Sequence, residues 1–203
     1  MNKLFRKKTR HLALWWYTVV TKACERVIKM CVQHKNVKNA EDLLRQLKIT
    51  KIPVDVKKIC EDLGFVITYA DLSPVEKAHG GKQISGALVL ENGKKDIFVN
   101  QDDIPTRQRF TIAHELAHYF LHHDEDTMSS EKHAIISFRG AKNKTEYEAD
   151  KFAAELLMPL EHITRLYEEL PVPYVSALAH RFDVSNAAMR YRLDSLRKNY
   201  IDL

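Results

Sequence analysis

Residues 109–120 read RFTIAHELAHYF and give the clearest helix pattern in the sequence. Apolar side chains follow a helical period at Phe110, Ala113, Ala117 and Phe120, as expected of a buried helix. On a helix, residues i and i+4 lie on one face with their Cβ atoms about 5–6 Å apart. His114 and His118 can therefore bind one metal ion between them, which is the HExxH zinc pattern.

Glu115 completes this motif. Because a helix turns by about 100° per residue, Glu115 is rotated out of the ligand pair but stays close enough to take a proton from the attacking water. The stretch thus predicts two metal ligands and a general base on one helix. The alternative is a helix whose two histidines simply hydrogen-bond to backbone or water.

A third ligand is expected downstream, because catalytic zinc usually has three protein ligands and one open position. The best candidate segment is 145–150, which opens the apolar run 152–158. Glu146 and Asp150 are i and i+4 and share a face. Glu146 would bind the metal, and Asp150 would fix one histidine ring through its free nitrogen. Glu148, rotated by about 200° from Glu146, remains the alternative third ligand.

The two segments resemble those of the ImmA/IrrE family of metallopeptidases. The resemblance rests on RFTIAHELAHYFLH at 109–122 and EYEADKFAAELLMP at 146–159, and it covers residues 50–197. It implies a zinc-dependent protease that cuts a helix-turn-helix repressor, often that of a mobile genetic element, and so releases silenced genes. It also implies metal-ligand roles for His114, His118 and Glu146, and the catalytic role for Glu115.

Other side chains near the motif are candidates for assisting the chemistry. His122 is i+4 from His118 and shares its face, and Tyr147 could donate a hydrogen bond to a developing oxyanion. His123 and His133 are weaker candidates, expected to be exposed or to support a ligand. The polar segment 123–144 is expected to be an irregular loop that forms a wall or lid of the cleft.

The sequence before the motif predicts further helices and a sheet. We expect helices at 39–48 and from Pro53 to Gly64, and strands at 65–69, 87–90 and 97–100. The Asn-Gly pair between the last two strands is a strong hairpin signal. The expected fold is therefore α+β, with a small antiparallel sheet packed on a zincin-like HExxH helix and a second ligand-bearing helix. We expect the 97–100 strand, or its hairpin partner, to be the edge that holds an extended substrate.

A helical annex is expected at the C-terminal end. Helices at 174–182 and 185–196 about a short turn look like a helix-turn-helix step. Its second helix carries Arg190, Arg192 and Arg197, which could contact phosphate, but packing on the body is the preferred interpretation. The expected domains are a basic and aromatic helical extension at 1–36, a zinc metallopeptidase domain at 37–160, and the annex at 161–203.

Composition favours one compact body with short appendages. The chain has 203 residues, 45% hydrophobic, and a formal net charge of +5. Its basic residues are densest at Lys3–Arg10 and are expected to be a solvated tail, so contact with DNA is possible but not favoured. Three cysteines without a CxxC pair indicate reduced thiols and a cytoplasmic protein. The apolar run at 12–20 is too short to span a membrane, and it has no cleavage signal for export.

Two functions remain open on sequence grounds. In the first, the chain is a zinc endopeptidase, and Glu115→Gln abolishes cleavage but leaves metal bound. In the second, a structural metal site supports a regulator that binds a repressor or DNA through its C-terminal helices, and Glu115 is dispensable. An intact Glu115 favours the first, because a structural site closes its fourth position and needs no base. One zinc per chain is expected, with manganese as an alternative, because this donor set accepts several metals.

Overall fold

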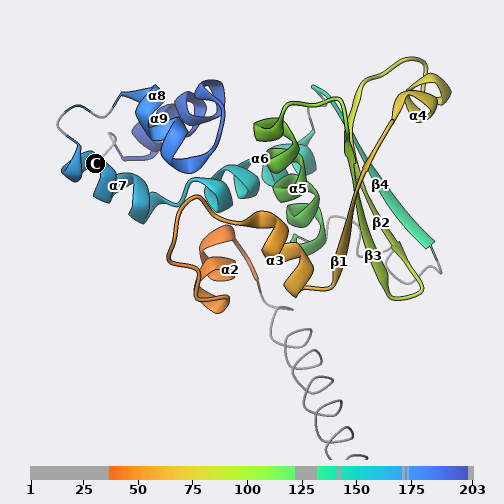
Figure 1. Cartoon of the computed structure of the whole chain (residues 1–203), viewed down its shortest axis with the longest axis horizontal. Coiled ribbons are helices and arrows are strands. Elements are labelled where there is room, and N and C mark those ends of the chain that lie inside the picture. Colours follow the sequence, from red (N-terminus) through yellow and green to blue (C-terminus); the bar gives the residue numbers. More distant parts are fainter. Residues whose placement is uncertain (1–36, 122–131, 141–142, 171, 173, 201–203) are drawn as a thin grey trace, which may run out of the picture. The chain divides into compact units, whose positions relative to one another are not determined.

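The computed structural model describes residues 37–121, 132–140, 143–170, 172 and 174–200 (Figure 1). Contacts divide the chain into two compact units, Met1–Asn36 and Val37–Leu203, and the second unit is the one described below. The basic tail and the apolar run expected near the N-terminus lie outside the described residues. Among the described helices, none is both long and apolar enough to cross a bilayer.

The second unit has an α+β fold with a four-stranded sheet. Its strands are β1 (Phe65–Ala70), β2 (Ile84–Glu91), β3 (Lys94–Asn100) and β4 (Lys132–Phe138), in the order β1-β3-β2-β4. The expected hairpin is confirmed, because β2 and β3 pair antiparallel with Glu91 opposite Lys94. Asn92 and Gly93 both have positive φ, 49° and 77°, as a two-residue turn of this kind requires.

The expectation of a purely antiparallel sheet was wrong. β1 pairs parallel with β3, so the sheet is mixed. The chain leaves β1 through the short helix α4 (Ser73–Ala78) before it enters β2. The returning strand β3 then inserts between β1 and β2 and runs in the same direction as β1. The connection through α4, rather than the pattern of any one strand, sets this direction.

The expected edge strand was also wrong. Both strands of the hairpin lie inside the sheet, and its edges are β1 and β4. β4 itself falls in the segment predicted to be an irregular loop. The pattern of β4 is hard to recognise because Ser137, a polar residue, is one of its buried positions at 3% exposure, which breaks the alternation expected of a half-buried strand. Residues 123–131 and 141–142 of that segment lie outside the described part.

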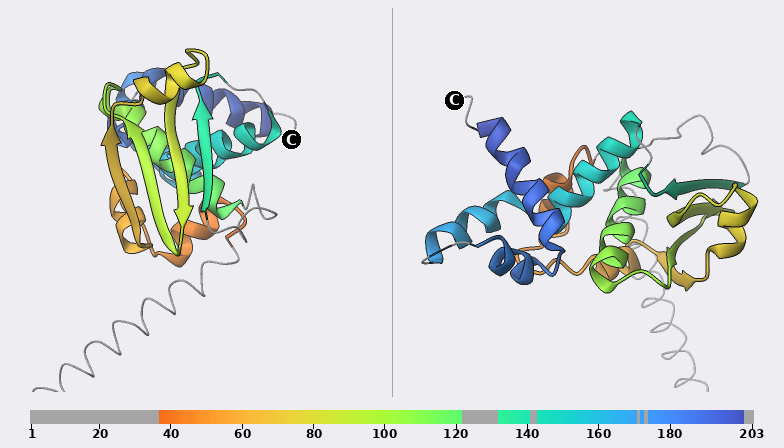
Figure 2. Two further views of the ribbon diagram at one scale, coloured as in Figure 1. Left: turned by 90° about the vertical axis from the view of Figure 1, so that its right-hand side faces the viewer. Right: turned by 90° about the horizontal axis from the view of Figure 1, so that it is seen from above.

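Apart from α4, the helices lie on one side of the sheet (Figure 2). They are α2 (Ala40–Gln46), α3 (Val56–Asp62), α5 (Pro105–Phe120), α6 (Lys144–Leu157), α7 (Leu160–Glu169), α8 (Val175–Phe182) and α9 (Asn186–Tyr200). On this side α5 packs on β2 and β3, and α3 packs on β1. The expected cap of α2 is present, with the Asn39 side chain accepting from the Asp42 amide at 2.9 Å. α3 begins at Val56 instead of Pro53, because the Asp55 carboxylate caps it by accepting from the Lys58 amide at 3.0 Å.

One continuous core joins these elements. α5 packs on β2, β3, α3 and α6, and Ile112 and Leu116 on it are fully buried. The same cluster of buried side chains continues through Phe152 on α6 to Phe182 on α8 and Met189 on α9. α5 and the C-terminal helices therefore share one hydrophobic interior, within the single compact unit 37–203.

Two arginines connect the C-terminal helices to the body. Arg109 on α5 donates to the carbonyl oxygens of Val54 and Asp183 at 3.1 Å each, and also pairs with the Asp183 carboxylate at 3.0 Å. Asp183 ends α8 in the left-handed conformation, with φ of 52°. The first turn of α5 is thus held to the segment before α3 and to the turn between α8 and α9.

Arg192 agrees with the preferred interpretation that the C-terminal helices pack on the body, and not with the alternative in which it contacts phosphate. Its residue is only 7% exposed, and its guanidinium donates to the Met158 carbonyl oxygen at 3.3 Å and pairs with Glu155 at 3.4 Å. Arg192 therefore binds the carbonyl end of α6, where a cation is favoured. Arg190 and Arg197 are exposed.

Candidate metal centre

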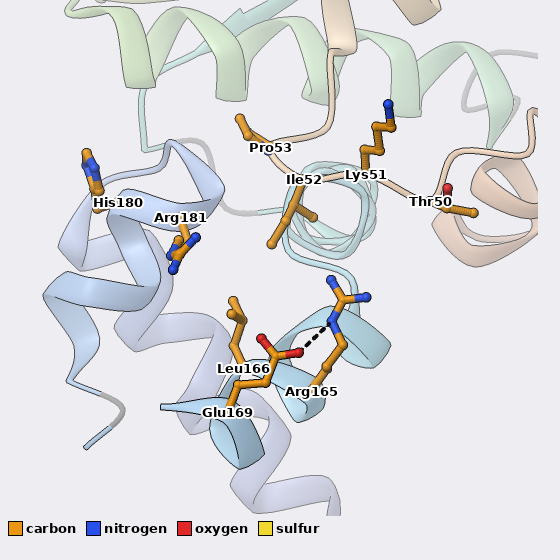
Figure 3. Close-up of a pocket in the computed structure, with 9 residues that line it drawn as sticks. All are labelled: Thr50, Lys51, Ile52, Pro53, Arg165, Leu166, Glu169, His180 and Arg181. Carbon is orange, nitrogen blue, oxygen red and sulfur yellow. Dashed lines mark ion pairs between the residues drawn. The ribbon is translucent and has the colours of Figure 1, made fainter. Parts of the chain in front are cut away.

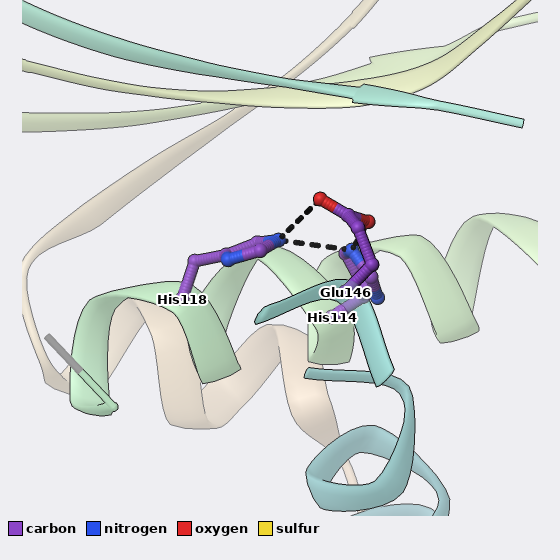
Figure 4. A group of neighbouring side chains, drawn as sticks. All are labelled: His114, His118 and Glu146. Carbon is purple, nitrogen blue, oxygen red and sulfur yellow. Dashed lines mark hydrogen bonds and ion pairs between the residues drawn. The ribbon is translucent and has the colours of Figure 1, made fainter. Parts of the chain in front are cut away.

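Two helices bring the candidate ligands together. α5 begins at Pro105, a favourable first residue for a helix, and it carries His114 and His118 at 7% and 2% exposure. α6 begins after Asn143, whose side chain accepts from the Glu146 amide at 2.8 Å. This cap places Glu146 in the first turn of α6, facing the two histidines (Figure 4).

The distances within this cluster suit a metal site. Nε2 of His118 lies 3.0 Å from Nε2 of His114 and 3.6 Å from Oε1 of Glu146. Nε2 of His114 lies 3.1 Å from Oε2 of Glu146. One donor atom from each of the three residues lies within 4.8 Å of the others, so the group could hold a metal ion. Two imidazoles and one carboxylate are a donor set found in catalytic zinc sites.

Asp150 makes the contact expected of it. Its Oδ1 lies 2.9 Å from Nδ1 of His114, one turn after Glu146 on the same face of α6. An acceptor at Nδ1 fixes the proton there and leaves Nε2 directed at the cluster. Burial lowers the pKa of His114, but its hydrogen bonds to Asp150 and Glu146 outweigh burial and raise the pKa to about 10.

Two of the other candidates, Glu148 and Tyr147, lie away from the cluster. Glu148, the alternative third ligand, pairs with Lys144 at 3.8 Å on another face of α6. Tyr147 is 59% exposed and does not line the cleft at the metal site. His122 and His123 lie outside the described residues. His133 belongs to β4, but its side chain is not described.

Glu115 is fully buried beside the cluster. Among the described residues, neither of its carboxylate oxygens has a hydrogen-bond partner of standard geometry. Burial raises the pKa of Glu115 to about 7, although the charge of His114 and the nearby Ser137 hydroxyl act to lower it. A carboxyl group with a pKa near neutrality can both take up and release a proton in the course of a reaction.

Gly86 on β2 lets α5 approach the sheet at this point. A Cβ at this position would lie 2.5 Å from Cγ2 of Thr111, 2.7 Å from the Phe98 carbonyl oxygen and 3.2 Å from Oε1 of Glu115. One contact is to backbone, so a methyl group cannot be accommodated by side-chain rotation alone. The absence of a side chain at Gly86 therefore sets the depth at which Glu115 lies against the sheet.

Gly86→Ala is expected to destabilise the fold by about 1–3 kcal/mol, the usual cost of overpacking, and to weaken zinc binding because α5 must move. Thermal unfolding and zinc titration would measure the two effects. Gly64→Ala is the matched control: nothing lies within 4 Å of the added methyl, but φ is +79°. That variant should lose stability through backbone strain while keeping zinc affinity. Wild-type zinc affinity in Gly86→Ala would show that the close approach is not needed.

Comparison with known proteins identifies the family. Residues 60–194, more than half of the chain, match the family described as the IrrE N-terminal-like domain. The chain belongs to this family. The matched residues run from the end of α3 into α9 and include the whole candidate metal centre, so the family match and the cluster describe the same part of the molecule.

Two curated relatives are similar to the IrrE-like region. Metallopeptidase ImmA of Bacillus subtilis is 26% identical over 119 residues, which are 56% of this chain and 65% of the relative. Radiation response metalloprotease IrrE of Deinococcus deserti is 37% identical over 99 residues, which are 48% of this chain and 35% of the relative. The matched stretches thus span less than two thirds of either relative.

A cleft of about 240 Å³ opens beside the candidate centre of this IrrE-like chain. His114, Glu146 and Asp150 line it together with residues that sequence reasoning did not select: Ser85, Arg107, Phe110, Thr111, Ser137, Phe138, Arg139 and Gly140. Arg107 precedes His114 by two helical turns and so shares its face, a signal available in the sequence. Ser85 and Ser137 come from β2 and β4, where the pairing shifts register between Ile84 and Gly86, and no sequence pattern indicated that irregularity.

If His114 binds a metal ion, metal affinity is expected to rise with pH, because the ion must displace the proton on His114. With the pKa of His114 raised from 6.5 to about 10, its protonated form stabilises the metal-free fold. That stabilisation is fully present below pH 6.5 and is lost as pH rises through about 10. Thermal unfolding of the metal-free chain across this window, compared with His114→Gln, measures the effect. If the unfolding midpoints of the metal-free wild type and of His114→Gln changed in parallel with pH, the prediction would be wrong.

Proposed function

We propose that this chain is a zinc-dependent endopeptidase in which His114, His118 and Glu146 bind the metal and Glu115 is the general base. The observation that carries the proposal is the fully buried Glu115 carboxyl beside three donor groups that could hold a metal. Burying a carboxyl group in this way costs stability, which a purely structural metal site has no reason to require. The names of the relatives agree with a peptidase.

Glu115 and Asp150 have different roles in the proposed reaction. When bound, zinc supplies a Lewis acid that polarises the scissile carbonyl and makes water more acidic. Glu115 takes the proton of the attacking water and passes it to the leaving amine, for which its pKa of about 7 is suitable. Asp150 holds the His114 ring in the orientation needed for binding.

We infer that the substrate backbone binds in extended form along β4. β4 is an edge of the sheet, and its last residues, Ser137 and Phe138, line the cleft beside His114 and Glu146. An edge strand presents unpaired N–H and C=O groups to which an extended peptide can hydrogen-bond. This arrangement would place a scissile bond across the first turn of α6, in a zincin-like manner.

The proposed substrate is a helix-turn-helix repressor in the cytoplasm, often one from a mobile genetic element. The resemblance of residues 109–122 and 146–159 to the ImmA/IrrE family supports this choice. Cys60, a buried free thiol, is compatible with a reducing compartment. Zinc is the preferred metal, and manganese remains the alternative.

The non-proteolytic alternative, a regulator that binds DNA or a repressor through a helix-turn-helix-like α8–α9 pair, has less support. Of the three arginines on which it depended, Arg192 is buried against α6. The non-proteolytic alternative also assigns no role to the buried Glu115. Regulation that persists in Glu115→Gln, without cleavage of the repressor, would restore this alternative.

The test is direct cleavage of purified helix-turn-helix repressors by the zinc-loaded chain, with intact-mass detection of both fragments. A chelator and the Glu115→Gln variant are the two controls, and each should abolish the fragments. Addition of zinc after chelation should restore cleavage, and manganese in its place measures the metal preference. Fragments that persist in the Glu115→Gln sample would point to a contaminating protease and contradict the proposal.

A further inference from the structure

A second hollow, of about 520 Å³, shares no lining residue with the cleft at the metal centre. Three elements form it: the segment 50–53 before α3, α7 and the end of α8 (Figure 3). We refer to it as the α7–α8 groove. It lies within the compact unit 37–203, and the proposed peptidase mechanism gives it no task.

The interior of the α7–α8 groove is apolar. Leu166 on α7 is 4% exposed and belongs to the core, and Ile52 is half-buried. In Figure 3, Ile52 points into the space between α7 and α8, with Pro53 beside it. An inserted aliphatic or aromatic side chain would meet apolar surface on two sides, which favours its burial.

The rim of the groove is cationic. Its lining includes three basic residues, Lys51, Arg165 and Arg181, and one carboxylate, that of Glu169. Glu169 pairs with Arg165 at 3.5 Å across one turn of α7. Within the described ranges, no ion pair joins Lys51 or Arg181 to an acidic residue, and both are exposed. The rim therefore carries a formal surplus of two positive charges, which attracts an acidic partner.

The segment that joins α7 to α8 also exposes large apolar side chains. Val172 and Tyr174 in this segment are 52% and 66% exposed. Large apolar side chains gathered on a surface with a charged rim are typical of protein-binding sites. A small anion would instead need a buried polar group to hold it, but the polar residues that line the groove are all exposed, and its buried and half-buried lining residues are Leu166 and Ile52.

We propose that the α7–α8 groove docks an acidic segment of the substrate protein, with one bulky apolar side chain inserted between Ile52 and Leu166. This role rests on the proposed proteolytic function, because the docked protein is the one that is cut. Docking at a distance from the metal centre raises the effective concentration of the scissile segment at the cleft. Such docking selects a substrate by a segment other than the sequence around the scissile bond.

Binding of defined peptides tests the proposal without any cleavage. The probe is a fluorescein-labelled peptide in which Asp and Glu alternate with Leu, titrated with the full zinc-loaded chain carrying Glu115→Gln and followed by anisotropy. Two comparison peptides replace every Leu by Ser, or every acidic residue by Lys. The expected result is saturable binding of the first peptide alone, weakened by added salt.

Charge reversal then locates the bound peptide. The double variant Lys51→Glu, Arg181→Glu should weaken binding at least about tenfold. Lys77→Glu, Lys198→Glu changes the net charge equally at exposed positions outside the groove and should bind as the parent does. Both variants should retain bound zinc, which shows that the fold is intact. Equal weakening in the two variants, or equal binding of the Ser peptide, would overturn the proposal.

Failure of the docking site and failure of the proposed function are distinguishable. If the parent chain cuts a repressor but the acidic peptide does not bind, the groove proposal is wrong and the peptidase stands. If the peptide binds in the groove and no repressor is cut, the groove binds a partner but not a substrate, and the proposal as stated is overturned. Cleavage of the repressor that slows in the groove double variant and not in its control supports both.

Discussion

Glu115→Gln is expected to lower the rate of repressor cleavage by roughly 10²–10⁴-fold, the range typical for removal of a general base. Gln has nearly the same shape but cannot take a proton from water. The metal centre should remain occupied, because Glu115 is not one of the three clustered donors. Single-turnover cleavage, with zinc content measured on the same samples, separates the loss of chemistry from a loss of metal.

The same substitution should leave stability unchanged or increase it. Burial raises the pKa of Glu115 from 4.5 to about 7, so its protonated form is the one that the fold favours. The associated stabilisation is present below pH 4.5 and is lost as pH rises through about 7. Above that pH, removal of the buried charge should raise the unfolding midpoint of the metal-free chain. A destabilised Glu115→Gln would mean that the carboxylate has a structural partner.

His114→Ala and Glu146→Gln are expected to abolish stable zinc binding, and Glu148→Gln to retain near one zinc per chain. The reason is geometric, since donor atoms of His114, His118 and Glu146 lie within 4.8 Å of one another, whereas Glu148 pairs with Lys144. Inductively coupled plasma mass spectrometry on dialysed protein measures the content. Circular dichroism on the same samples excludes unfolding as the cause.

Asp150→Ala should give an intermediate result. Loss of the partner that orients a metal-binding histidine typically costs about 10–100-fold in metal affinity, less than loss of a ligand. A competition titration with a coloured chelator measures a loss of zinc affinity of this size.

The ligand variants have two outcomes that would contradict the proposal. Zinc retained in Glu146→Gln but lost in Glu148→Gln would reverse the choice of third ligand. A folded wild type without zinc would refute the peptidase proposal.

The candidate centre was largely predictable because its information is local. The spacing of His114 and His118 follows from helix geometry, and the pairing of Glu146 with Asp150 follows from the same i, i+4 rule on a second helix. Both predictions depend only on the formation of the two helices and not on the surrounding fold. The contact between Asp150 and His114 at 2.9 Å confirms that the two predicted faces meet.

The sheet was less predictable because strand direction and strand order depend on long-range connections. The hairpin between β2 and β3 was found from its Asn-Gly turn, but the parallel partner of β3 comes from more than 20 residues earlier in the chain. β4 was missed because a buried polar residue, Ser137, interrupts its pattern. The partners of Arg192 were not predictable for a similar reason, because Glu155 and Met158 lie at the end of α6 and no local pattern connects them to α9.

The contacts of Arg109 have a consequence for motion. This side chain lies near the start of α5, the helix that carries His114, and its acceptors include the backbone of Phe182 and Asp183, at the end of α8. Local opening of that turn would release one end of the metal helix, so the two regions should exchange their amide hydrogens as a single cooperative unit. Because Arg181 precedes those acceptors, a protein held at α8 would also restrain the histidines, and substrate capture could tighten the metal centre before any bond is cut.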